Sequence, residues 1–136
     1  MQPFKFIEHT ADIIIRSYGH SLEELFTNSA AGMQQYIFGE LRNSRHGEPK
    51  TFEVNCQASS CDLLLADWLS EILYLNSTEY VRIFEFSFKI LNENEVTSSG
   101  LAHKAQAINE IKAVTLHGLE VVKRNNTWTA TVTYDI

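Results

Sequence analysis

Two aspartates near opposite ends of the chain are the residues best placed to do chemistry. Asp12 directly precedes Ile13, Ile14 and Ile15, and this run of β-branched residues predicts a buried strand. Asp135 likewise adjoins the apolar alternation of the last predicted strand. If the two strands are neighbours, the carboxylates meet, and two like charges are unfavourable unless a proton or a cation lies between them. The pair therefore predicts a site for a hard divalent cation such as calcium.

The α-carboxylate of Ile136 adds a third oxygen ligand if the chain ends at that residue. A simpler interpretation is that each aspartate ends a strand and is solvated, and spacing alone favours it. An alternative interpretation places a catalytic site here. His9 lies three residues before Asp12, and the two side chains could act as base and orienter beside a metal-bound water in a small phosphoesterase. The simpler role for His9 is a hydrogen bond to the turn before the strand.

Two further groups of polar side chains are candidates for contact with a partner. Lys112 and His117 flank a short apolar stretch, where the lysine binds a phosphate or a partner's acid, or simply reaches solvent. Asp67 and Glu71 lie one turn apart on one face of a predicted helix. They are metal ligands, a docking site for a basic partner, or a solvated stripe. The sequence leaves these interpretations open.

Two predicted helices must position these residues. The first begins with a capping box at Ser21 and Glu24, has a single apolar face, and ends at Gly39. The second opens after Ser60 and runs to Leu75 with apolar residues on most sides. Such a helix is central, packed on a sheet with another layer over it.

The remaining periodic segments predict strands, so the fold class is α+β, with two helices packed on a mostly antiparallel sheet. Strand 82–91 is predicted to place Phe84, Phe86, Phe88 and Ile90 on one face. Asn125 and Asn126 predict a tight hairpin turn. The strands are predicted at residues 4–6, 11–18, 52–56, 82–91, 96–107 (weak, interrupted near Gly100), 111–115, 119–124 and 127–134, with an exposed loop at 42–49.

The composition predicts a single domain, residues 1–136, in the cytoplasm. The chain has 17 acidic and 11 basic residues and a net charge of −6, which disfavours direct binding of nucleic acid and suits a basic partner. No apolar run is long enough to span a membrane, and no signal pattern opens the chain. Cys56 and Cys61 are therefore predicted to be reduced thiols; a zinc half-site would lack a second pair.

Four motifs in order resemble the archease family. The first is His9 to Asp12 followed by an apolar strand and Tyr18-Gly19, and the last is Asp135-Ile136 at the chain's end. Between them, segments 62–75 and 111–121 resemble the family's second and third signatures. The departures are small: Ile14 stands where many members have glycine, and Leu116 where an aromatic residue is common.

This resemblance implies a protein cofactor of an RtcB-type RNA ligase in tRNA splicing. Such a cofactor promotes guanylylation of the ligase's active-site histidine, allows multiple turnover and relaxes the nucleotide preference. It is not catalytic alone. The resemblance also implies a metal site, often occupied by calcium, with Asp12, Asp135 and Ile136 as ligands, and places Lys112 in a motif needed for activation. A chaperone-like modulator that binds proteins through its exposed helix surfaces is the other alternative.

Overall fold

The computed structural model describes residues 2–8, 11–40 and 46–136. Within these ranges it contains two helices and seven strands, and the α+β class is confirmed. Their order is β1 (Phe4–Glu8), β2 (Asp12–Gly19), α1 (Leu22–Phe38), β3 (His46–Gln57), α2 (Cys61–Thr78), β4 (Val81–Leu91), β5 (Glu95–Lys104), β6 (Ala113–Arg124) and β7 (Thr127–Asp135).

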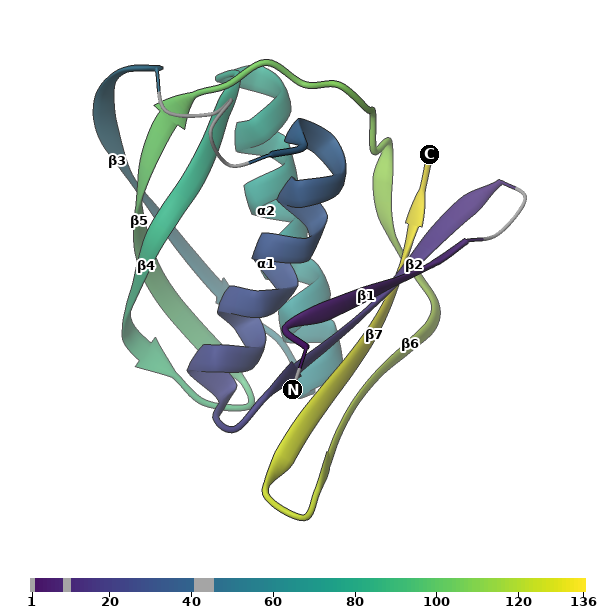
Figure 1. Cartoon of the computed structure of the whole chain (residues 1–136). Coiled ribbons are helices and arrows are strands. Elements are labelled where there is room, and N and C mark those ends of the chain that lie inside the picture. The colour runs from purple at the N-terminus through teal and green to yellow at the C-terminus, as the bar shows by residue number, and fades with distance from the viewer. Residues whose placement is uncertain (1, 9–10, 41–45) are drawn as a thin grey trace.

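The strands form two antiparallel sheets rather than one, and the helices lie between them (Figure 1). One sheet has the order β1-β2-β7-β6, and the other has the order β3-β5-β4. The two helices run in the same direction, and residues 105–112 cross over their C-terminal ends from β5 to β6 (Figure 1). This crossover moves the chain from one sheet to the other. It also explains why α2 is apolar on most sides, since α2 contacts both sheets.

The start of α1 follows the predicted capping box. The Glu24 amide donates to Ser21 Oγ at 3.1 Å, and the His20 amide donates to Glu24 Oε1 at 3.1 Å. The first bond satisfies an amide that a helix N-terminus leaves without a partner, and the second joins the residue before the cap to the first turn. Gly39 ends the helix with a φ of 77°, a conformation that suits glycine, as predicted.

Aromatic side chains fill the space between the three-stranded sheet and the helices. Trp68 of α2 is fully buried and contacts Phe26, Phe86 and Phe88, with ring centroids 5.2–5.8 Å apart. Its indole N–H donates to Ser98 Oγ at 2.9 Å, so the only polar atom of the side chain is satisfied.

The expectation that Phe84 and Ile90 share a face with Phe86 and Phe88 is wrong. Ile90 is 37% exposed and follows a second shift of the pairing after Phe88. Phe84 instead contacts His103 of β5, at 5.6 Å between ring centroids. The pairing of β4 with β5 shifts between Phe84 and Ser87, and Glu85 between them has a φ of 52°. A β-bulge at this point reverses the alternation of side chains, because an inserted residue moves every later side chain to the other face.

Three strand boundaries also differ from the prediction. β5 is continuous and central in its sheet instead of weak and interrupted at Gly100. A Cβ at Gly100 would lie 2.4 Å from Ile83 Cγ2, so the glycine permits close packing rather than a break. β3 begins at His46, inside the predicted loop 42–49, of which 42–45 lies outside the described residues. Segments 111–115 and 119–124 contribute to one strand, β6, with a register shift around Gly118.

A buried polar network closes the outer edge of β4. Gln34 of α1 accepts from the Ile83 amide at 2.7 Å and donates to the Ile83 carbonyl at 2.9 Å, as a neighbouring strand would. Asn76 of α2 donates through Nδ2 to Gln34 Oε1 at 3.0 Å and to the Val81 carbonyl at 2.9 Å. The network therefore fixes both helices to the same strand.

Candidate functional site

The sheet register brings the two aspartates together. Asp12 of β2 lies directly opposite Asp135 of β7, and Ile13 lies opposite Tyr134. Ile13 and Tyr134 are buried beneath the helices at 4% and 1% exposure, so the alternation of a strand places both aspartates on the outer face. Residues directly opposite in an antiparallel pair have Cα atoms about 4.5–5.5 Å apart. Two carboxylates that are far apart in sequence are thus neighbours.

The main chain around Asp135 also carries Lys112 and Ile136. The Lys112 amide donates to the Asp135 carbonyl at 2.7 Å, and Ala113 lies opposite Asp135 on β6. Lys112 is exposed and lines a pocket of about 300 Å³ with Ser70 and Tyr74 of α2. Its side chain therefore starts on the helix side of the sheet edge, whereas its main chain is bonded to Asp135. Ile136 follows Asp135 and packs partly against the core.

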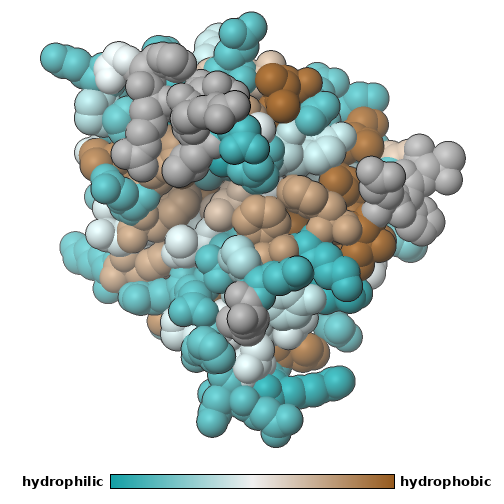
Figure 2. Space-filling view, viewed as in Figure 1, coloured by the Kyte–Doolittle hydropathy of each residue, from teal (hydrophilic) through white to brown (hydrophobic). Residues whose placement is uncertain are grey.

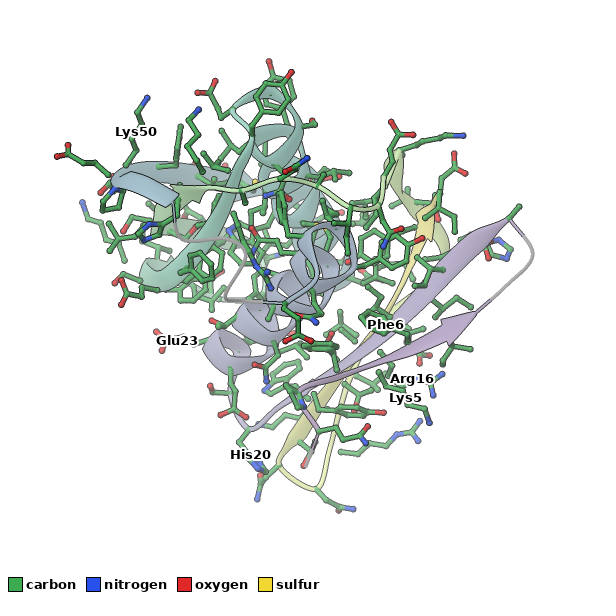
Figure 3. All side chains as sticks on the ribbon, turned by 45° about the horizontal axis from the view of Figure 1, so that its top comes forward. Lys5, Phe6, Arg16, His20, Glu23 and Lys50 are labelled. Atoms are coloured by element: carbon green, nitrogen blue, oxygen red, sulfur yellow. The ribbon has the colours of Figure 1, made fainter. Side chains whose placement is uncertain are left out.

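Farther along the same outer face the charge reverses. Lys5, Arg16 and Thr131 lie opposite one another across β1, β2 and β7, and Figure 3 shows Lys5 and Arg16 side by side. Arg16 Nε donates to Thr131 Oγ1 at 3.3 Å. Arg16 is four residues from Asp12, or roughly 13 Å along a strand. The face is therefore acidic at one end, whereas its middle row contains Lys5 and Arg16 together with Glu120 of β6.

The other predicted site residues do not lie close to Asp12 and Asp135. Asp67 and Glu71 lie on the exposed side of α2, near enough to Cys56 of β3 to affect its thiol. His117 is exposed on β6 beside the register shift. His9 lies outside the described residues, so its predicted role with Asp12 stays a prediction. Among the residues that the structure describes, no three His, Cys, Asp or Glu side chains are grouped closely enough to hold a metal.

Both cysteines are free thiols of low reactivity. Burial, followed by the charges of Glu71 and Asp67, raises the pKa of Cys56 to about 11. Burial, with smaller effects of Glu93 and Asp62, raises the pKa of Cys61 to about 11. At neutral pH the thiols are therefore protonated, which disfavours metal binding through sulfur.

Sequence reasoning missed a second pocket, under residues 105–112 at the C-terminal ends of the helices. It has a volume of about 230 Å³ and is lined by Asn76, Ser77, Tyr80, Asn109 and Glu110 together with apolar residues. Asn76 lies four and seven residues after Ile72 and Leu69, on the apolar face of α2. A polar residue on such a face was the available signal. Neither helix among the described residues is long and apolar enough to cross a membrane.

Known proteins resemble this chain over its whole length. The family model described as the Archease protein family matches residues 4–136. The chain is 35% identical to the archease of Methanosarcina mazei, over 98% of this chain and 95% of that protein. It is 31% identical to the archease of Archaeoglobus fulgidus, over 98% of each.

Two solved structures have the same fold. The solution structure of protein 1598 from Methanobacterium thermoautotrophicum matches with a TM-score of 0.76 at 29% identity, over 100% of both chains. A crystal structure from Thermotoga maritima, described as an archease and possible chaperone, matches with a TM-score of 0.63 at 24% identity, over 97% of this chain and 96% of that one. With the family model matching all but the first three residues, the chain belongs to the archease family.

Proposed function

We propose that this chain is a cytoplasmic protein cofactor that activates an RtcB-type RNA ligase in tRNA splicing. The observation that carries the proposal is the acidic corner, where Asp12 lies opposite Asp135 and Lys112 bonds to the main chain of Asp135. Membership of the archease family supports the same role. Among the residues that the structure describes, the corner supplies acids and one cation but no evident nucleophile, so these residues suit assistance of another protein's chemistry.

The donor set at this corner fits a hard cation such as calcium. Asp12 and Asp135 provide only carboxylate oxygens, and where the chain ends at Ile136 its α-carboxylate adds another. Two side-chain ligands leave most coordination positions to main-chain oxygens, water or a partner. A cation held here would supply positive charge for orienting the phosphates of a nucleotide.

The chain's own residues would act by charge and position. The acidic corner would dock against the basic groove in which a ligase holds its RNA, so this protein need not bind nucleic acid itself. Lys112, at the edge of that corner, would meet a phosphate or an acid of the ligase. Such positioning would favour attack by the ligase histidine on the nucleotide and so its guanylylation.

The test is a turnover assay of a cognate ligase with Asp12→Ala and Asp135→Ala. Each variant should lose most of the stimulation, because each removes half of the acidic pair. Glu120→Ala is the matched control, since Glu120 is an exposed acid on the same sheet, opposite Thr131 and away from the corner. The proposal fails if both aspartate variants are folded and stimulate like wild type.

A chaperone-like modulator is the second candidate, and the surface favours it in one respect. Figure 2 shows hydrophobic residues in a band across the middle of one face. Suppression of the aggregation of an unrelated unfolded protein, unchanged by Asp12→Ala, would support it. The phosphoesterase alternative predicts turnover of a phosphoester by the purified protein that His9→Ala abolishes.

A further inference from the structure

The pocket under residues 105–112 contains a buried acceptor that has no partner. Asn76 is 4% exposed, and its Nδ2 is used by Gln34 and Val81. Its Oδ1 has no hydrogen-bond partner among the described residues. Asn76 lines the pocket, so a donor that enters the pocket and reaches this buried oxygen would satisfy it. A buried acceptor without a partner is costly, and a ligand that donates a hydrogen bond would remove that cost.

The charges around this pocket favour a cation. Among the described residues, Glu110 is the only charged one in its lining. Both helices end here, and neither has a basic residue in its last turn to balance the partial negative charge of the helix end. Arg82 and Lys104 already bind the carbonyls of Gly39 and Glu79, just beyond the two helices. The crossover also caps α1, because the amides of Ile108 and Asn109 donate to the Ile37 carbonyl. Neither Arg82 nor Lys104 lines the pocket, so the Glu110 carboxylate is the group that favours a cation there.

The remaining walls suit a flat cation on an apolar stem. Ile37 of α1, Leu73 of α2 and Ile111 of the crossover provide aliphatic surface. Tyr80 is 67% exposed at the rim, where its ring can stack on a planar cation. A guanidinium has five N–H donors in one plane and stacks on aromatic rings, whereas an ammonium is a compact point charge that is held by water.

We propose that this pocket binds an arginine side chain of the partner ligase, an inference that rests on the proposed function. The guanidinium would donate to the Glu110 carboxylate and to Asn76 Oδ1, with its stem against the aliphatic wall. The location supports this, because the neighbouring pocket shares Leu73, Ser77 and Ile111 and reaches Lys112, next to the acidic corner. One docked protein could then contact both places.

The first test uses N-acetyl-arginine amide as the probe, titrated into the full chain and followed by NMR. Shifts should centre on Asn76, Tyr80 and Glu110, with the lysine analogue binding more weakly and the uncharged citrulline analogue more weakly still. Glu110→Gln should weaken binding by about tenfold, since it removes a charge-assisted hydrogen bond. Equal shifts for arginine and citrulline, or shifts elsewhere on the protein, would overturn the proposal.

A pair of helix variants separates the pocket from general damage. Ser77→Phe places a ring at a lining position and should abolish binding of the arginine probe. Thr78→Phe, at the next residue, which is exposed and not part of the lining, should leave it intact. Both should remain folded because neither residue is buried. If Ser77→Phe binds the probe like wild type, the pocket is not the site.

A ligase stimulation assay with the same two variants tests whether the pocket contributes to activation. Ser77→Phe should raise the concentration of this protein needed for half-maximal stimulation at least about tenfold, with Thr78→Phe unchanged. Unchanged stimulation by Ser77→Phe would overturn the assignment to the ligase. Failure of the acidic-corner proposal would be recognised separately, because Asp12→Ala should bind the arginine probe normally.

Discussion

The two sheets use their side chains in opposite ways. The three-stranded sheet packs Phe86 and Phe88 against Trp68, and the Gln34 network satisfies its exposed edge. Every one of these contacts favours folding. The four-stranded sheet instead places Asp12 directly opposite Asp135, an arrangement of like charges that disfavours pairing. A local conflict of this kind, in an otherwise consistent fold, is typical of a functional site.

The largest expected difference between the sheets concerns the two tryptophans. Trp68→Ala should lower the free energy of unfolding by about 3–5 kcal/mol, because it leaves a large cavity in a closed core. Trp128→Ala in the four-stranded sheet should cost less, since Trp128 is half-buried and lies under Lys123 at 5.5 Å. Chemical denaturation of both variants measures the difference. Equal losses would show that the two sheets contribute alike, contrary to the comparison.

The parts of the fold that could be predicted are those whose signal is local. The caps at Ser21 and Gly39, the alternation from Phe52 to Cys56 and the turn at Asn125 each depend on a few neighbouring residues. β5 could not be read in this way. Its inward positions are small, including Gly100 and Ala102, because larger side chains of β4 and α2 already fill that space.

The two candidate sites also differ in whether a local sequence signal points to them. An acid beside a run of isoleucines indicates a conflict that only a distant partner can resolve, so the sequence could point to Asp12 and Asp135. The pocket at Asn76 could not be predicted, because its walls come from α1, α2, Tyr80 and residues 105–112. Their meeting depends on how the crossover passes over the helix ends. Periodicity contains no information about that path.

Substitutions at the acidic corner should raise the free energy of unfolding, whereas those at the tryptophans lower it. Asp12→Asn and Asp135→Asn should each raise the free energy of unfolding by about 0.2–1 kcal/mol in the presence of a chelator, because each removes a repulsion between facing charges. Both should weaken calcium binding in calorimetry. Added residues after Ile136 should weaken it further where the α-carboxylate is a ligand.

The control is Thr133→Val on the same strand, which removes no charge and should leave calcium binding unchanged. If the two asparagine variants are less stable than wild type without metal, the pair is held by favourable contacts, and the sheet contains no conflict at this corner. Unchanged calcium affinity in both would remove the metal from the proposal while leaving the stability comparison intact.

The smallest effect on stability near neutral pH is expected at the cysteines, which lie in β3 and at the start of α2. With the pKa of Cys56 and of Cys61 raised from 9.0 to about 11, the thiolate fraction at pH 8 is about a hundredfold below that of the unfolded chain. Alkylation by iodoacetamide should therefore be slow in the folded protein and fast in denaturant. Because burial disfavours the thiolates, the fold should lose stability as the pH rises from 9.0 towards 11, where the thiols of the unfolded chain ionise first.

The double variant Asp67→Asn with Glu71→Gln separates the causes of this shift. Burial is the larger cause for Cys56, so the variant should lower its pKa only in part and speed alkylation of Cys56 modestly. Cys61 should be unaffected, because its neighbouring charges are Glu93 and Asp62. Ligase stimulation measured on the same variant then decides what the two acids do. If stimulation stays at the wild-type level while Cys56 reacts faster, Asp67 and Glu71 affect only the charge environment of β3. In that case activation depends on the four-stranded sheet that carries Asp12 and Asp135.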